Sequence, residues 1–431
     1  MPLNLDHLQP LQSMTKGKQT LSFTRYQKFI IGLLAFLQFT VVLDFMVLSP
    51  LGAILMDELK LEPARFGVVV SAYAFSAGIS GLLTAGFADR FDRKKLLLFF
   101  YAGFMLGTFL CALAPGFHFL LIARIITGLF GGVIGSIGFA IITDLFALEY
   151  RGRVMGFVQM AFSASQILGL PIGLILANRY GWHAPFWMIG SIGILVGGVI
   201  AIYMRPVRDH LEIKMDKSPI RHLIGTISRS SHILGFLVMA LMTTGGFMLM
   251  PFASAFAVHN IGLTLEQLPL LYGVTGAFNI FGGPLIGKLA DQYGKFRIFF
   301  WGSIVGLITM LYYTHLGITP LLWVIVINVI LFLGITARRI SASALITAIP
   351  EPRDRGAFMS VSSSIQQFSG GIASTLAGMI VIQQDNGLLQ RYDVLGYVVA
   401  CTMITVVLLL IRVNRQVDPK QKSLAVESPQ T

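Results

Sequence analysis

The chain has little charge and almost no cysteine. Of its 431 residues, 12% are charged and 55% are hydrophobic, and only two are cysteines. Soluble domains carry about 25% charged residues, so an ordinary soluble protein is excluded. Cys111 and Cys401 both lie in apolar runs, where thiols pack as small hydrophobic side chains. We therefore expect no disulfide, no redox centre and no metal site.

Two further absences exclude other classes. The phosphate-binding pattern Gly-x-x-x-x-Gly-Lys-Ser/Thr does not occur, so transport driven by ATP bound to this chain is excluded. An intramembrane enzyme would need a second buried acid, a histidine-rich metal set or a serine with a base, and the apolar runs offer none of these. We expect no enzyme activity and no cofactor. The net charge of +12 is spread over loops, so we expect no nucleic-acid partner either.

What the sequence has is a series of long apolar runs. A helix needs about 20 apolar residues to cross a bilayer, and twelve windows meet that length. We therefore predict an all-α polytopic membrane protein whose outer loops are too short to form a domain. The predicted helices lie near residues 29–54, 65–88, 96–114, 118–146, 152–178, 182–204, 233–258, 266–290, 298–317, 320–348, 356–383 and 391–413.

The basic residues gather on one side of this predicted topology. With the N-terminus in the cytosol, all but five of the 32 lysines and arginines fall on cytosolic segments, Arg338 and Arg339 being counted as loop residues. The exceptions are Lys60, Arg65, Arg179 and Arg391 on outer loops and Arg124 within a helix. This bias predicts that both termini are cytosolic in the cell (inner) membrane. The first residues hold no apolar core, so we expect no cleaved signal peptide.

A polar, basic segment over residues 205–232 divides the chain. It separates a first six-helix bundle (29–204) from a second (233–413), between an N-terminal segment (1–28) and a tail (414–431) that are both predicted to be cytosolic. Some 28 residues are too few to bury a core, so we expect a connector rather than a regulatory domain, with or without an amphipathic helix on the lipid surface.

The two halves resemble each other. Three segments recur in the same order and at nearly one spacing, which indicates two pseudo-symmetric bundles from an internal duplication. Such repeats place a substrate site between the halves near mid-membrane. The pairs are Asp44–Pro50 with Gly246–Pro251, Asp89–Arg93 with Asp291–Lys295, and Thr143 and Arg151 with Thr347 and Arg355.

Asp44 stands alone as an acid in the apolar run from Phe29 to Gly52. A charge at that depth costs roughly 2.5–3.5 kcal/mol or more, so it usually marks an ion or proton path. At about 1.5 Å per residue, Arg124 of the fourth window lies deep enough to meet it. Apolar surroundings favour the protonated acid and an arginine favours the carboxylate, so Asp44 can titrate during transport. The alternative is a permanent ion pair that only fixes helix packing.

The loop after the eighth window carries a specific signature. It reads Gly287-Lys288-Leu289-Ala290-Asp291-Gln292-Tyr293-Gly294-Lys295, which matches Gly-x-Leu-Ala-Asp-x-x-Gly-Arg/Lys. The fourth window has Arg124 and Gly128 in an Arg-x-x-x-Gly spacing. On these motifs the chain resembles the major facilitator superfamily over nearly its whole length. The loop after the second window departs from the signature, because Ala85 and Asp92 replace glycines.

The resemblance implies a conformational latch at the cytosolic loops. Asp89 would face the positive N-terminus of the eleventh helix near Gly356, and Arg93 would pair with Asp144. The alternative is that Arg93 and its lysine neighbours serve topology alone. We predict a latch made of Asp89, Arg93, Asp144, Gly287, Asp291, Gly294 and Lys295.

The fifth window holds Gly169-Leu170-Pro171-Ile172-Gly173, followed by Gly181-Trp182-His183. This resembles the proton-driven efflux branch of the superfamily, of the sugar-efflux or arabinose efflux permease type. It lacks the adjacent Gly-Pro of the drug antiporters, and His183 stands where arginine is usual. Gly128, Gly169, Pro171 and Gly173 form a predicted helix-packing motif, and a plain packing seam is an equal alternative.

Together these features predict a secondary active transporter that works by alternating access. We expect a monomeric, proton-coupled antiporter that exports small amphipathic molecules such as drugs, sugars or metabolites; proton-coupled uptake or facilitated diffusion is the alternative. A wall rich in methionine and aromatic residues suits varied ligands. Candidate cavity residues are Gln38, Tyr73, Gln166, Phe247, Met248, Tyr272, Asn279, Asn328 and Gln366.

Overall fold

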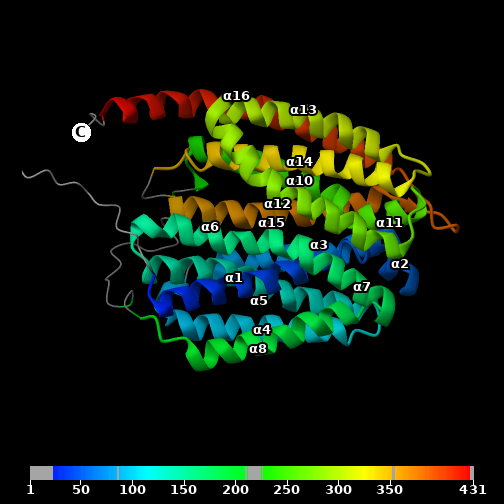
Figure 1. The fold of residues 1–431 in the computed structure, drawn as a ribbon, viewed down its shortest axis with the longest axis horizontal. Coiled ribbons are helices and arrows are strands. Elements are labelled where there is room, and N and C mark those ends of the chain that lie inside the picture. Colours follow the sequence, from blue (N-terminus) through cyan, green and yellow to red (C-terminus); the bar gives the residue numbers. More distant parts are fainter. Residues whose placement is uncertain are drawn as a thin grey trace, which may run out of the picture.

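The computed structural model describes residues 23–84, 87–208, 211, 225, 227–351 and 355–427. It is a bundle of long helices that run side by side (Figure 1). The first half consists of α1 (Arg25–Val47), α2 (Gly52–Glu58), α3 (Pro63–Thr84), η1 (Ala88–Arg90), α4 (Arg93–Ala112), α5 (Phe117–Leu145), α6 (Leu148–Ala164), η2 (Ser165–Gly169), α7 (Leu170–Tyr180) and α8 (Ala184–Tyr203).

The second half occupies the upper part of Figure 1 and is also helical. Its elements are α10 (Ser230–Leu249), η4 (Met250–Phe252), α11 (Ala253–His259), η5 (Leu265–Gln267), α12 (Leu268–Tyr293), α13 (Lys295–Thr314), α14 (Leu321–Ile346), α15 (Arg355–Ile380), the strands β1 (Ile382–Gln383) and β2 (Leu389–Gln390), and α16 (Tyr392–Glu427). In the described part of the chain, eleven helical spans are long and apolar enough to cross a membrane. The serine-rich α15 is a further long helix and packs along α3. The predicted all-α membrane fold is confirmed.

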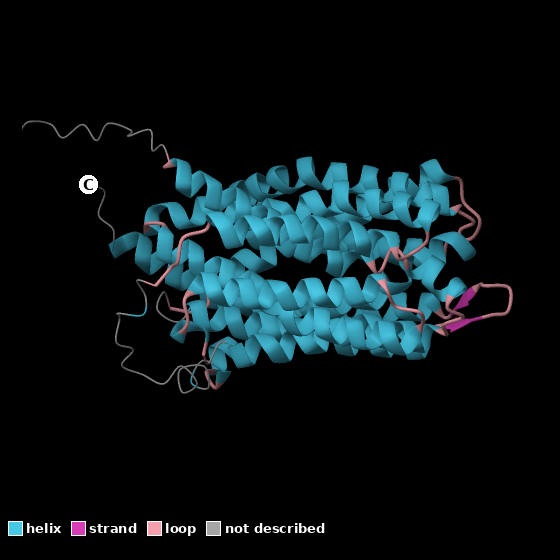
Figure 2. Ribbon diagram, turned by 90° about the horizontal axis from the view of Figure 1, so that it is seen from below, coloured by secondary structure: helices cyan, strands magenta, loops and turns pink. Residues whose placement is uncertain are grey.

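We name the two ends of the bundle by what lies there. The basic end is where α1 begins and α16 ends, and the hairpin end carries the antiparallel pair β1–β2 (Figure 2). The side chain of Asn260 holds this hairpin, because its amide donates to the Leu389 carbonyl and its oxygen accepts from the Leu389 amide, each at 2.9 Å. The hairpin was not predicted, and the helix expected over 356–383 ends at Ile380 instead.

Prolines break two predicted helices at equivalent places. The window 29–54 is interrupted between Val47 and Gly52, next to Pro50, and 233–258 is interrupted by η4, which contains Pro251. Proline has no backbone N–H and disrupts the helix before it, which explains both breaks. A third proline, Pro171, follows the π-helical turn η2, which interrupts the fifth window between α6 and α7.

The helix expected over 391–413 continues to Glu427 and takes in most of the predicted tail, while its membrane-spanning part, Tyr392–Arg415, agrees with the expected bounds. Arg338 and Arg339 lie inside α14, as the window 320–348 predicts, so counting them among the loop charges was wrong. Arg353 and the greater part of the connector 205–232 lie outside the described residues.

The apolar core joins the halves at one end only. One cluster at the hairpin end is continuous across them and includes Val47 and Phe66 from the first half with Phe252 and Tyr392 from the second. Towards the basic end, each half has its own cluster. The halves therefore share a continuous apolar core at the hairpin end and have separate apolar clusters towards the basic end.

Candidate functional site

Asp44 of α1 and Arg124 of α5 meet in the interior of the first half. Arg124 Nη1 donates to Asp44 Oδ2 at 2.9 Å and lies 3.3 Å from the Asp44 carbonyl oxygen. The two side chains are 0% and 1% exposed, so water does not screen the pair. Sequence analysis predicted this contact from the depth of each residue along its membrane helix, and the structure confirms the contact.

Two other helices complete the surroundings of this pair. Thr108 of α4 donates to Asp44 Oδ1 at 3.0 Å, and the Arg124 guanidinium lies 4.7 Å from the ring centre of Tyr73 on α3. Each carboxylate oxygen therefore has a donor, and the cation rests on an aromatic face. The Nε of Arg124 has no hydrogen-bond partner. The sequence did not single out Thr108, because a threonine in an apolar window usually bonds its own helix backbone, which Thr108 also does.

Glycines bring the helices close enough for these contacts. Gly128, one turn after Arg124, has no room for a Cβ, which would overlap Tyr73 and Ser76 of α3. A Cβ on Gly169 would likewise overlap Leu43, the neighbour of Asp44, and one on Gly173 would lie 3.1 Å from Val47. Pro171 faces Gly273 of the second half. The predicted packing motif therefore surrounds the site but contributes no polar group to it.

Of the contacts predicted for the latch, the structure shows the pair of Arg93 with Asp144, both in the first half. Arg93 Nε donates to Asp144 Oδ2 at 3.0 Å, and Arg93 Nη1 donates to the Ala88 carbonyl at 3.2 Å. The side chain of Asp89 and the surroundings of Gly356, its expected partner, are not among the described parts of the chain. In the second half, Gly294 has a φ of +97° at the turn between α12 and α13, a conformation that favours glycine. Gly287 has open space beside it, Asp291 is exposed and Lys295 is half-buried.

Asp92, one of the departures from the signature, anchors the connector. It caps α4 by accepting from the Lys94 amide at 2.9 Å, and it also accepts from the Val207 amide at 3.2 Å and from Arg208 Nε at 2.8 Å. Partial burial raises the pKa of this carboxyl, but these donors, Arg208 first, outweigh burial and hold its pKa below the ordinary value. The sequence reasoning missed this role, although an acid that replaces a glycine before a helix is a cap signal.

The candidate cavity residues do not form one site. Tyr73 stacks on Phe45 with ring centres 5.0 Å apart, and Phe45 stacks on Phe247 of the second half at 5.8 Å. This aromatic series leads from Arg124 across to the other half. The others are more scattered: Gln38 lies near Gly135, Gln166 in η2 and Tyr272 in α12 are half-buried, Met248 is buried, Asn279 accepts from Thr336, Asn328 donates to Thr275, and Gln366 donates within its own helix.

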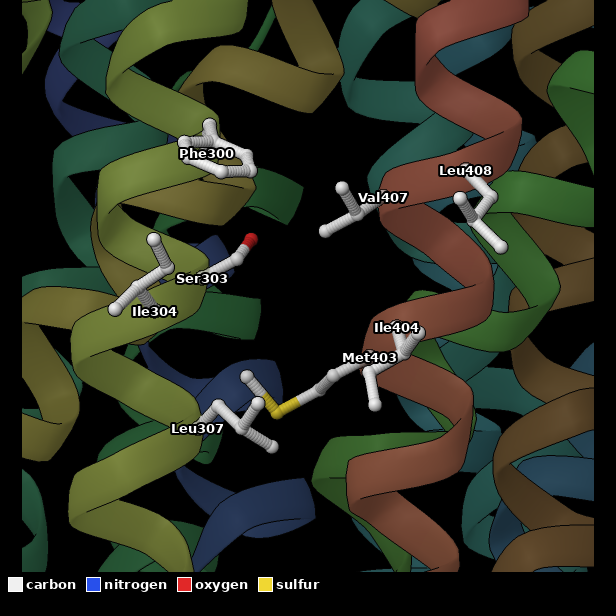
Figure 3. A pocket seen from close by; sticks show the side chains of 8 residues that line it. All are labelled: Phe300, Ser303, Ile304, Leu307, Met403, Ile404, Val407 and Leu408. Atoms are coloured by element: carbon white, nitrogen blue, oxygen red, sulfur yellow. The ribbon is translucent and has the colours of Figure 1, made fainter.

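A pocket lies elsewhere, between α13 and α16 of the second half (Figure 3). Its volume is about 210 Å³ and its lining is apolar except for Ser303, whose hydroxyl donates to the Phe299 carbonyl. None of its residues belongs to the first half, so it is separate from the Asp44–Arg124 pair. It offers no group for proton transfer. The lining residues are Phe300, Ser303, Ile304, Leu307, Met403, Ile404, Val407 and Leu408.

Comparisons with known proteins agree with this fold. The family profile described as Major Facilitator Superfamily matches residues 34–338, and that described as MFS/sugar transport protein matches residues 277–430. A probable sugar efflux transporter of Helicobacter pylori (strain G27) is 25% identical over 84% of this chain and 90% of its own. Multidrug resistance protein 3 of Bacillus subtilis (strain 168) is 29% identical over 43% of this chain and 36% of its own.

Solved structures resemble the chain in fold. The crystal structure of a bacterial homologue of the human lysosomal transporter Spinster, in an inward-facing and unoccupied conformation, superposes with a TM-score of 0.70 at 18% identity. The alignment covers 91% of this chain and 96% of the Spinster homologue. At this level of identity the likeness concerns the arrangement of helices and nothing finer.

Proposed function

Because the chain belongs to the major facilitator superfamily, we propose that it is a proton-coupled antiporter that exports small amphipathic molecules. It is a membrane transporter rather than an enzyme, and relatives of it are named efflux and resistance proteins. The observation that carries the proton coupling is the fully buried Asp44–Arg124 pair. An ionisable group inside a membrane bundle is costly and is usually retained for ion or proton transport.

Protonation of Asp44 would change the charge of the site by one unit. Arg124 would lose its counter-charge and keep only the Tyr73 ring and the Asp44 carbonyl as near partners. Thr108 can still bond the protonated acid. A buried cation without its anion is costly, so protonation favours an arrangement in which water or substrate reaches Arg124. This local change of charge would bias the equilibrium between two conformations.

Hydrogen bonds between the two halves at the hairpin end support alternating access. Ser254 of α11 donates to the Ser49 carbonyl at 3.0 Å and accepts from the Ala53 amide at 3.2 Å. Asn178 of α7 donates to the Leu265 carbonyl at 2.8 Å. These bonds join the two halves where their core is continuous. We take the basic end as cytosolic, so the arrangement corresponds to an inward-facing state.

Export then follows from the order of events. In the inward-facing state Asp44 releases its proton and substrate enters from the basic end. The halves rock, the bonds of Ser254 and Asn178 open, and the basic end closes. In the outward-facing state substrate leaves and Asp44 takes up a proton. The inward proton gradient thus drives substrate outward.

The test uses the purified transporter in liposomes that contain a pH-sensitive dye, with N-phenyl-1-naphthylamine as the transported probe. We expect an imposed pH gradient to drive transport of N-phenyl-1-naphthylamine. We also expect transport of this probe to move protons, which the enclosed pH-sensitive dye reports. Asp44→Asn should abolish both without lowering expression, whereas Asp385→Asn, at an exposed acid of the hairpin loop, should change neither. Full pH-driven transport by Asp44→Asn would refute the proposal. Comparison of inside-out with right-side-out vesicles separates export from uptake.

A further inference from the structure

Two adjacent arginines lie inside α14 without an acidic partner. Arg338 and Arg339 are two turns before the last residue of the helix, Ile346, which puts them about 10 Å from its basic end. Among the described residues, neither guanidinium has an ion pair or a hydrogen bond, and the Nε of Arg338 is buried and unpartnered. Arg338 is buried, and buried charges are normally paired, so its lack of an acidic partner among the described residues requires an explanation.

Arg339 lies on the face of α14 that is turned towards the first half. Its guanidinium is 4.8 Å from the ring centre of Phe162 on α6. Asn328 and Ile335 share this face, because they precede Arg339 by whole turns of the helix. Ile335 and Arg339 are exposed, as are Leu322, Trp323, Val326 and Ile330 on the opposite side of α14, but only the side of Arg339 also contacts the first half through Phe162. This face therefore borders accessible space between the two halves.

Arg338 adds a second positive charge behind Arg339. It is 8% exposed and lies 5.7 Å from the ring centre of Phe299 on α13. In the first half, by contrast, Arg124 is neutralised by Asp44. A cation within a membrane bundle is costly, and here no described acid offsets it. An anion that is not part of the protein would do so.

We propose that Arg339, with Arg338 behind it, binds the anionic group of the substrate, a carboxylate, sulfonate or phosphate, on its way from the basic end. Phe162 would contact the apolar part of the same molecule. This inference rests on the proposed transport function and gives its substrate class: amphipathic anions. An arginine suits the role because its planar guanidinium can make two parallel bonds to such a group.

Two dyes with one skeleton test this assignment. 8-Anilinonaphthalene-1-sulfonate and N-phenyl-1-naphthylamine differ by the sulfonate, and both fluoresce on binding. We expect the transporter, in nanodiscs of phosphatidylcholine, to prefer the sulfonate. Arg339→Gln should lower the ratio of the two affinities about tenfold or more, because a charge-assisted bond is lost. Arg339→Lys should retain part of the preference, since it keeps the charge.

A matched control separates the site from general attraction. Arg412 of α16 is an exposed arginine towards the basic end, and Arg412→Gln should leave the ratio unchanged. An unchanged ratio in Arg339→Gln, or an equal drop in Arg412→Gln, would overturn the proposal. An effect that appears only when phosphatidylglycerol is added would assign the arginine to a lipid headgroup and would also overturn it.

Binding is measured without a proton gradient, so this result is independent of the role of Asp44. If proton-driven transport of the neutral dye fails, the proposed function is contradicted. The affinity ratio of the two dyes still decides whether Arg339 binds an anion. Arg338→Met offers a second variant, for which we expect a smaller drop in the ratio because Arg338 lies behind the binding group.

Discussion

The two halves share one fold and differ in where they hold charge. In the first, Asp44 and Arg124 form a buried ion pair. At the equivalent positions of the second half stand Gly246, which has no side chain, and Asn328, which donates to Thr275 Oγ1 at 3.4 Å. The two halves therefore share their helices, but of these equivalent positions only those of the first half hold charged side chains.

Nearer the basic end, the second half holds a charged residue where the first half has none. Arg339 has no counter-charge, whereas Gly135 occupies the matching position of the first half, by the spacing that aligns Arg124 with Asn328. One half thus has a buried charge pair, and the other has two cations without an acidic partner among the described residues. The two proposals made above therefore assign proton coupling to the first half and substrate recognition to the second.

The largest expected effect concerns the membrane potential. Exchange of one entering proton for one leaving monoanion moves two charges, so 100 mV contributes about 4.6 kcal/mol, against about 2.3 for a neutral substrate. When potassium diffusion potentials are imposed on liposomes, the transport rate of the sulfonate dye should therefore rise with the potential far more than that of the neutral dye. If the membrane potential changed the transport rates of the two dyes equally, the anion would not be carried as a charge in addition to the proton.

Breaking the pair should cost more than breaking its neutral counterpart. Arg124→Gln leaves Asp44 buried without a cation, which typically destabilises by about 3–5 kcal/mol. Asn328→Ala removes one neutral hydrogen bond and should cost about 1 kcal/mol. Thermal unfolding of the two purified variants in one detergent compares them directly. Similar losses of stability would show that the ion pair is not distinguished from an ordinary packing contact.

Most of the fold could be predicted because apolar length and turn residues determine membrane helices directly. Asp44 and Arg124 were also predictable, since an isolated charge in an apolar run is conspicuous. Their contact followed from depth along two helices, which the regular rise of a helix supplies. The break at Pro50 was missed because proline is tolerated in membrane helices and need not end one.

Contacts that depend on helix rotation could not be predicted. Thr108 resembles any other threonine in an apolar window until α4 is placed beside α1. Arg338 and Arg339 were counted with the loop charges, although the predicted window 320–348 contains them, because a basic pair on the cytosolic side agrees with the positive-inside rule. Their contacts with Phe299 and Phe162 depend on the rotation of α14, which the sequence does not give. The hairpin was missed because its strands have two residues each.

The smallest expected effect concerns the difference between the two loops that correspond to the family signature, after α3 and after α12. Gly294 has a left-handed φ of +97°, but Asp92 at the matching position has a φ of −55° and needs no glycine. Asp92→Asn should lower stability at pH 7 by about 0.5–1.5 kcal/mol, because a neutral amide accepts the Lys94 and Val207 amides more weakly and loses the solvent-screened pair with Arg208.

The pH dependence of this loss gives the prediction its sign. The pKa of Asp92 is held below its ordinary value, so its stabilisation is present above that value and disappears as pH falls through the lowered one. Unfolding midpoints of the wild type and Asp92→Asn should therefore converge below about pH 4. Asp385→Asn, at an exposed acid of the hairpin loop, should match the wild type throughout. A gap that stays constant with pH would mean that Asp92 acts through its shape and not its charge.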